Sequence, residues 1–177
     1  LLTPEARGFN SKVVPAMSAS LRDAACTYCG QCAVVCPTGA IVEKDEVDKV
    51  WAALEDPNKH VLVQGAPAIR AMLGEEFGLP PGTLVTGKMI AALRRLGFDR
   101  VFDTNFTADL TILEEGHELL ERASNGGPLP MMTSCSPGWI KFIEHFYPSL
   151  LPHLSTCKSP QQMFGALAKT YYAKMAG

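Results

Sequence analysis

The chain has 177 residues, with 16 lysines and arginines against 18 aspartates and glutamates, and a formal charge of −2. Apolar residues make up 47% and charged residues 19%, which excludes a disordered, collagen-like or coiled-coil chain. The small net charge offers no electrostatic footprint for nucleic acid or anionic lipid. No apolar run is long enough to span a membrane, and the first residues lack a signal-peptide pattern. We therefore expect a cytoplasmic protein without nucleic-acid or membrane partners.

The apolar pattern predicts a mixed α/β chain. Residues 1–45 hold most of the cysteines and are too short to fold alone, whereas residues 46–177 alternate short apolar runs with amphipathic stretches, as parallel β-α units do. The predicted elements, in chain order, are a helix over residues 47–54, a strand over 60–64, helices over 68–77 and 87–96, a strand over 100–103, a helix over 109–124, a strand over 129–133, a helix over 137–147 and a helix that begins at 159–160. We expect a twisted, mostly parallel sheet with flanking helices.

Four of the six cysteines form one cluster, Cys26-x-x-Cys29-x-x-Cys32-x-x-x-Cys36-Pro37. This spacing is typical of bacterial ferredoxins, in which three cysteines bind one [4Fe–4S] cubane and the fourth binds another. A zinc site or a set of buried thiols fits the spacing less well. Residues 1–45 are therefore predicted to be the C-terminal part of a two-cluster ferredoxin-like domain, whose companion cysteines are expected to precede residue 1.

A fifth cysteine, Cys135, lies between a predicted strand and a predicted helix. Backbone N–H groups at a helix N-terminus favour an anion and lower the pKa of a thiol. From the chemistry alone, Cys135 is either a nucleophile with His145 or His153 as its base, or a structural cysteine. We expect Cys157 to be a thiol packed in the core.

Four segments of the chain together resemble [FeFe]-hydrogenases. They are VQGAPAIR at residues 63–70, FTADLTILEE at 106–115, MMTSCSPGW at 131–139 and KSPQQMFG at 158–165. Their order matches the family, the resemblance covers nearly the whole chain, and the chain is most similar to the catalytic subunits of NAD(P)-linked multimeric hydrogenases. The resemblance implies that residues 46–177 are the incomplete N-terminal lobe of an iron hydrogenase catalytic domain.

An enzyme of this family interconverts H2 with protons and electrons at the H-cluster, a [4Fe–4S] cubane joined to a diiron centre that carries CO and cyanide. The resemblance implies that electrons pass through [4Fe–4S] clusters to or from ferredoxin, NAD(P)-linked subunits or other electron-carrier subunits. Further cluster ligands are expected after residue 177, so we expect the isolated segment to be inactive. The alternative is a hydrogenase-like iron–sulfur protein without H2 chemistry, serving electron transfer, sensing or iron–sulfur assembly.

The resemblance also implies a proton relay. Cys135 occupies the position of the thiol that exchanges protons with the diiron centre, and Glu115, Ser155 and Glu118 match the relay towards solvent, with Arg122 at its outer end. Their helical spacing supports part of this assignment, because residues at i, i+3 and i+7 share one helix face. Without the resemblance, the same spacing would more simply indicate a solvent-exposed charged stripe on the helix.

The cofactor pocket is implied by a second set of matching positions, Pro67, Ala68, Pro160 and Gln161. Gln161 has the chemistry to donate a hydrogen bond to a cyanide nitrogen. Ala68 departs from relatives that carry a hydroxyl at this position. By itself, Pro160 predicts only the start of a helix.

Ser136 is the larger departure, because the family pattern has a second cysteine there that binds the H-cluster cubane. A serine alkoxide is a poorer iron ligand than a thiolate near neutral pH, because the proton affinity of an alkoxide is far higher. Two readings stay open: Ser136 binds the cubane, or the turn shifts so that Cys135 binds the cubane and Ser136 carries protons.

Overall fold

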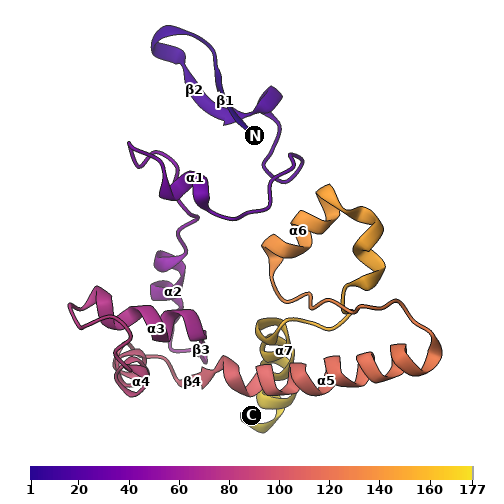
Figure 1. Ribbon diagram of the computed structural model, residues 1–177. Helices are drawn as coiled ribbons and strands as arrows, with labels where there is room; N and C mark the ends of the chain where they lie inside the picture. The colour runs from indigo at the N-terminus through magenta and orange to yellow at the C-terminus, as the bar shows by residue number, and fades with distance from the viewer. Residues whose placement is uncertain (177) are drawn as a thin grey trace. The chain divides into compact units, whose positions relative to one another are not determined.

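A computed structural model describes residues 1–176 (Figure 1). The chain forms two compact units, each made of two stretches of sequence. The first unit contains Leu1–Glu43 and His117–Cys157, and the second contains Lys44–Gly116 and Lys158–Gly177. The division into a ferredoxin-like segment 1–45 and a hydrogenase lobe 46–177 stays a prediction.

The first unit begins with an antiparallel hairpin that the sequence analysis did not predict. Strands β1 (Leu2–Glu5) and β2 (Lys12–Pro15) pair with Leu2 opposite Pro15. Short 3₁₀ helices η1 (Gly8–Asn10) and η2 (Ala16–Ser18) lie between and after the strands. The single-turn helix α1 (Gln31–Val34) follows Gly30, whose φ of 75° is a left-handed conformation that glycine adopts without steric cost.

The second stretch of this unit contains the end of α5 (Thr104–Asn125), α6 (Pro137–Phe146) and the 3₁₀ helix η3 (Pro148–His153). The strand predicted over residues 129–133 is instead one parallel bridge between Met132 and Leu154. Pro128 and Pro130 have no N–H to donate, so a longer ladder cannot form there. The bridge is still important, because its backbone hydrogen bonds hold the residues after η3 beside the segment that leads to Cys135.

The second unit is built on a two-stranded parallel sheet. Strands β3 (Leu62–Gly65) and β4 (Arg100–Asp103) pair with Leu62 opposite Arg100. Helices α2 (Val47–Leu54), α3 (Pro67–Glu76) and α4 (Thr86–Arg95) precede β4 in the chain. Helix α5 starts directly after β4, five residues earlier than predicted.

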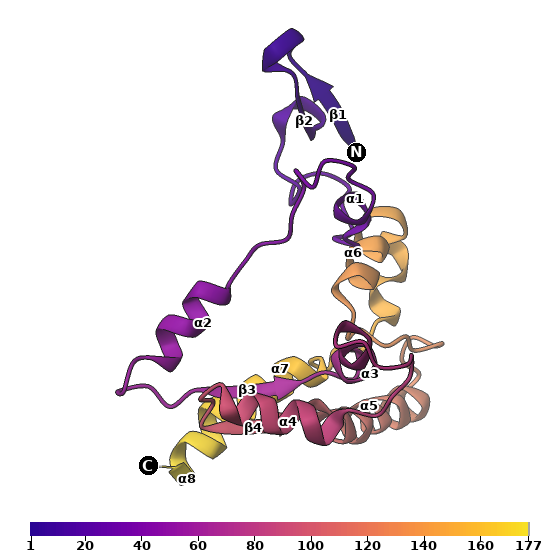
Figure 2. The same cartoon turned by 90° about the vertical axis from the view of Figure 1, so that its left-hand side faces the viewer.

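The last elements of the chain pack against β4. Helix α7 (Pro160–Leu167) continues through the π-helix η4 (Ala168–Tyr172) into α8 (Ala173–Ala176). The ring of Phe102 on β4 lies 5.2 Å from that of Phe164 and 5.4 Å from that of Tyr172, and Figure 2 shows α7 running along the strand pair. The predicted fold class, a mixed α/β chain with a parallel sheet and flanking helices, is confirmed. None of the helices within residues 1–176 is long and apolar enough to cross a membrane.

Candidate iron–sulfur site and proton relay

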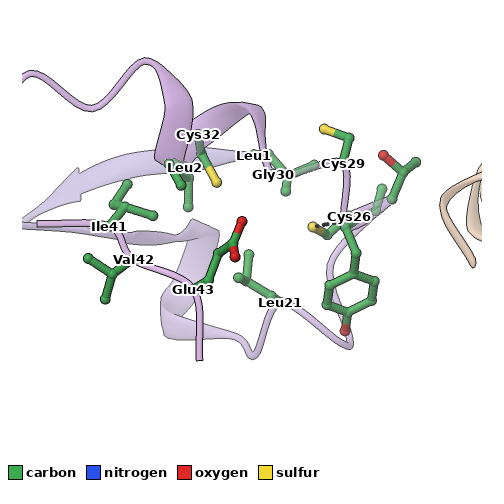
Figure 3. A pocket seen from close by; sticks show the side chains of 14 residues that line it. Leu1, Leu2, Leu21, Cys26, Cys29, Gly30, Cys32, Ile41, Val42 and Glu43 are labelled. Atoms are coloured by element: carbon green, nitrogen blue, oxygen red, sulfur yellow. Dashed lines mark hydrogen bonds between the residues drawn. The ribbon is translucent and has the colours of Figure 1, made fainter. Parts of the chain in front are cut away.

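Three of the four clustered cysteines line one cavity of about 520 Å³ in the first unit. Figure 3 shows the sulfur atoms of Cys26, Cys29 and Cys32 around this hollow. The rest of its wall is mainly apolar and includes Leu1, Leu2, Leu21, Ile41 and Val42. Thiolates around an apolar hollow are the donor set that a [4Fe–4S] cubane takes, so these residues fit that cofactor.

The loop that presents these thiols turns tightly. Tyr28 and Gly30 both have left-handed backbone conformations, with φ of 55° and 75°, and the N–H of Tyr28 donates to the Cys26 sulfur at 3.4 Å. The backbone N–H of Gln31, together with the Thr27 hydroxyl, lowers the pKa of the Cys29 thiol. N–H donors of this kind stabilise thiolates, which are the ligand form that iron requires.

Cys36 is separate from this group, because it does not line the cavity. Backbone N–H groups, first of all that of Ile41, and the hydroxyl of Thr38 lower the pKa of its thiol to about 7. A three-plus-one arrangement is what the ferredoxin spacing predicts. The assignment of Cys36 to a second cluster nevertheless stays a prediction. Within residues 1–176, no three His, Cys, Asp or Glu side chains gather closely enough to bind a single metal ion.

The most extensive polar network of the first unit surrounds Glu118 on α5. Its Oε2 accepts a hydrogen bond from the Ser155 hydroxyl at 2.7 Å, and its Oε1 accepts one from the Arg122 guanidinium at 2.6 Å. The Thr156 backbone N–H donates to both carboxylate oxygens, at 3.2 and 3.1 Å. The side chains of Glu118 and Arg122 are only 14% and 11% exposed, so this ion pair is largely removed from water.

These contacts keep Glu118 ionised. Burial opposes ionisation, but the hydrogen bonds from residues 155–157 and from Arg122 outweigh it and lower the pKa of Glu118 from 4.5 to about 2. Glu118 and Arg122 therefore do not belong to a solvent-exposed charged stripe on α5, because both side chains are largely buried in one hydrogen-bond network.

Arg122 also joins α5 to the chain that follows it. Its guanidinium donates to the carbonyl oxygens of Pro152 at 3.1 Å, Leu154 at 2.7 Å and Pro128 at 3.4 Å. A single guanidinium thus satisfies one carboxylate and three backbone carbonyls. This fork geometry is specific to arginine, because a lysine ammonium presents one compact charge.

Ser155 and Cys157 complete the network. The Ser155 hydroxyl accepts from the Cys157 N–H at 3.1 Å while it donates to Glu118. The Cys157 thiol also donates to Glu118 Oε2, at 3.5 Å. Sequence reasoning missed Thr156 and Cys157 as members of this site; their position directly after Ser155 was the only available signal.

Cys135 and Ser136 lie on an exposed turn immediately before α6. Ser136 is the N-cap of that helix but makes no capping side-chain hydrogen bond, and Pro137 follows as its first residue. The turn is connected to the Glu118 network, because the Ser134 hydroxyl donates to the Cys157 carbonyl at 3.3 Å. The roles of Cys135 and Ser136 stay predictions.

Glu115 lies one helical turn before Glu118 on α5 and is half-buried. No described hydrogen bond involves its side chain within residues 1–176. The shared face predicted for Glu115, Glu118 and Arg122 follows from one continuous helix. The role of Glu115 in a relay stays a prediction.

The predicted pocket residues occupy two helix starts in the second unit. Pro67 and Ala68 are the first residues of α3 and are exposed. Pro160 and Gln161 are the first residues of α7, whose N-cap Ser159 forms a reciprocal capping box with Gln162. Proline has no N–H, so the donors at these helix starts are the N–H groups of Ala68 and Gln161, which lack intrahelical acceptors.

Comparison with known families identifies the class of protein. The family "Iron only hydrogenase large subunit, C-terminal domain" matches residues 59–176, and the "4Fe-4S binding domain" family matches residues 22–42. The chain therefore belongs to the iron-only hydrogenase large-subunit family, an oxidoreductase family. The predicted cofactors of that family, [4Fe–4S] clusters and the H-cluster, are confirmed at this level.

Individual relatives agree with this assignment. The chain is 59% identical to the NADP-reducing hydrogenase subunit HndD of Solidesulfovibrio fructosivorans, over 97% of this chain and 30% of that protein. It is 53% identical to iron hydrogenase 1 of Clostridium pasteurianum, over 80% of this chain and 25% of that protein. A variant of apo [FeFe]-hydrogenase HydA1 from Chlamydomonas reinhardtii superposes with a TM-score of 0.71 and 49% identity, over 76% of this chain and 35% of that one. The chain thus spans about a quarter to a third of the length of these proteins.

The family includes members with other roles. The cytosolic iron–sulfur assembly component 3 of Bos taurus is 36% identical over 84% of this chain and 33% of its own length. Family membership therefore establishes a hydrogenase-like iron–sulfur protein, while H2 chemistry requires a separate argument.

Proposed function

We propose that the longer protein to which this chain belongs is an [FeFe]-hydrogenase that reversibly interconverts H2 with protons and electrons. The observation that carries the proposal is the buried network of Glu118, Ser155 and Arg122. In a protein that only transfers electrons or assembles clusters, this network would serve stability alone. The 2.7 Å contact from the Ser155 hydroxyl to the Glu118 carboxylate is in addition the geometry that proton transfer requires.

The H-cluster would be held partly by this chain. Pro67, Ala68, Pro160 and Gln161 would line its diiron pocket, and either Cys135 or Ser136 would contact its cubane, with further ligands from residues beyond the chain. When bound, the H-cluster supplies the electrons and the iron site at which H2 is formed or split.

The chain's own residues would move protons between Cys135 and solvent through Glu115, Ser155 and Glu118. At rest, the Ser155 hydroxyl donates outward to Glu118, because an ionised carboxylate can only accept. A proton that reaches Ser155 from the inner side therefore releases the serine proton to Glu118. Arg122 stabilises the carboxylate at the outer end of the path.

The low pKa of Glu118 is compatible with this role. Protonating a carboxyl of pKa about 2 at neutral pH costs about 7 kcal/mol. A barrier of that size by itself still permits roughly 10⁷ transfers per second. Glu118 is therefore a transient carrier that returns to the ionised form after each transfer.

Electrons would travel through the [4Fe–4S] cluster held by Cys26, Cys29 and Cys32, and through a second cluster that includes Cys36. The physiological partners would be ferredoxin, NAD(P)-linked subunits or other electron-carrier subunits, in the cytoplasm. The NADP-linked name of the HndD relative supports this choice of partner.

The test is H2 evolution from a reduced dye by the full-length protein after cofactor maturation. We expect Glu115→Gln and Cys135→Ala each to lower turnover by about a hundredfold or more. Iron content should be unchanged in Glu115→Gln, and unchanged in Cys135→Ala if Ser136 is the residue that contacts the cubane. Lys141→Met, which breaks an exposed ion pair with Glu144, is the matched control and should keep full turnover. Wild-type turnover in both relay variants would retire the relay assignment.

Iron–sulfur cluster assembly is the second candidate, because the Bos taurus assembly component is 36% identical to the chain. This candidate predicts bound [4Fe–4S] clusters without CO or cyanide bands in the infrared spectrum. A matured full-length protein that lacks both these bands and H2 evolution would favour assembly over the hydrogenase proposal.

A further inference from the structure

The Cys157 thiol lies in the Glu118 network instead of in an apolar core. Its sulfur is 3.5 Å from Glu118 Oε2, the oxygen that also accepts from Ser155. The backbone of Cys157 is held at both ends, because its N–H donates to Ser155 Oγ and its carbonyl accepts from the Ser134 hydroxyl. The position of the thiol is therefore set by the turn itself.

We infer that Cys157 is a positioning residue of the proton relay, whose thiol is the donor that withdraws from Glu118 Oε2 when this oxygen takes up a proton. The inference rests on the proposed function for its catalytic meaning. The contact between the thiol and the carboxylate, however, can be tested without turnover.

The two oxygens of Glu118 differ in their donors. Oε1 accepts from Nε and Nη2 of Arg122, and from both the N–H and the hydroxyl of Thr156. Oε2 accepts from the Ser155 hydroxyl, the Thr156 N–H and the Cys157 thiol. Because the guanidinium charge acts directly on Oε1, Oε2 is the oxygen on which a proton is better tolerated.

Once the Ser155 proton is transferred to Oε2, this oxygen becomes a hydroxyl oxygen with less capacity to accept, so one of its two other donors has to move away. A thiol is a weaker donor than a hydroxyl or a backbone N–H, and its S–H bond can rotate without moving the backbone. Withdrawal of the thiol leaves Ser155 and Thr156 in place. In this step the Ser155 Oγ–H bond breaks as the Oε2–H bond forms, Ser155 regains a proton from its inner neighbour in the relay, and one S–H bond reorients, with no oxidation.

Few other ionisable side chains lie where they could donate to Glu118 Oε2 and then withdraw from it. Arg122 and Glu115 lie on the same helix, where the other ionisable residues near Glu118, namely Glu114, His117 and Glu121, are exposed. On the 3₁₀ helix η3, whose Pro152 carbonyl accepts from Arg122, the Nδ1 of His153 is 2.9 Å from the Pro130 carbonyl oxygen. Within the described network, Cys157 is therefore the titratable side chain in contact with Oε2.

The direct test is the S–H stretching region of the infrared spectrum of the full-length protein. The Cys157 band, assigned by its loss in Cys157→Ala, should lie at a frequency typical of a hydrogen-bonded thiol. Glu118→Gln, which removes the charge but keeps the shape, should move the band to higher frequency. A band that is insensitive to Glu118→Gln would overturn the inference whether or not the protein evolves H2.

The functional arm measures H2 turnover against pH in the matured full-length protein. Cys157→Ala removes a donor to the ionised carboxylate, so the profile should move towards higher pH by about half a unit to one unit. Cys157→Ser, which restores a donor, should return the profile towards wild type. Thr170→Val, which removes a hydroxyl that donates only to its own helix at Ala166, should leave the profile unchanged.

The two arms separate the two proposals. An S–H band that responds to Glu118→Gln in a protein without H2 turnover would retain the thiol–carboxylate contact and reject the hydrogenase proposal. Active protein whose pH profile is identical in wild type and Cys157→Ala would reject the role of Cys157 and retain the hydrogenase proposal.

Discussion

Replacing Arg122 with methionine should loosen the turn over residues 155–157. Arg122→Met keeps the aliphatic stem but removes the guanidinium, which leaves the 14%-exposed Glu118 carboxylate without its cation. The substitution also removes the hydrogen bonds that Arg122 donates to the carbonyl oxygens of Pro152 and Leu154. Breaking a buried ion pair from one side costs about 3–5 kcal/mol.

The assay is amide hydrogen exchange of the full-length protein, read at the peptide that contains Thr156 and Cys157. Both N–H groups are bonded within this network, to Glu118 and to Ser155 Oγ. A loss of about 3 kcal/mol should accelerate their exchange roughly a hundredfold. The matched control, Lys141→Met, breaks an ion pair whose side chains are 33% and 40% exposed and should change exchange by less than about threefold. Equal exchange in both variants would refute the network as a source of local stability.

Three further outcomes follow. Because the pKa of Glu118 is depressed to about 2, its contribution is complete above pH 4.5 and is lost as the pH falls towards 2; exchange protection at residues 155–157 should fall over that range in wild type and stay flat in Glu118→Gln. Ser159→Ala removes a capping box from α7 and should cost about 1 kcal/mol in the free energy of local opening, read by exchange at α7. Ile143→Ala, at a side chain 1% exposed, should cost about 2–4 kcal/mol and lower the midpoint of urea unfolding; an unchanged midpoint would contradict the burial.

Local patterns predicted much of the secondary structure. The helix over residues 47–54 and the strand over 100–103 were predicted with the observed bounds, because each has a clear apolar period between turn residues. The helix predicted to begin at 109 begins at 104, since the threonines and asparagine that follow β4 have weak helix propensity and hid the start. The β1–β2 hairpin was missed because proline occurs in both strands and is unusual there.

The sequence by itself determined the iron–sulfur motif and the helix that carries the proposed relay. Cys26 and Cys29 lie on a loop and Cys32 on the single-turn helix α1 directly after it, so their spacing alone predicts that they surround one hollow. A continuous α5 necessarily places Glu118 and Arg122 one turn apart.

Only the tertiary structure decided what surrounds Glu118. Its donors at residues 155–157 lie 37 to 39 positions further along the chain, and no periodicity links positions so far apart. The Met132–Leu154 bridge and the Arg122 fork bring that turn onto α5. The protonation state of a carboxylate depends on the donors that reach it through space, so the pKa of Glu118 and the contact made by Cys157 were set by packing.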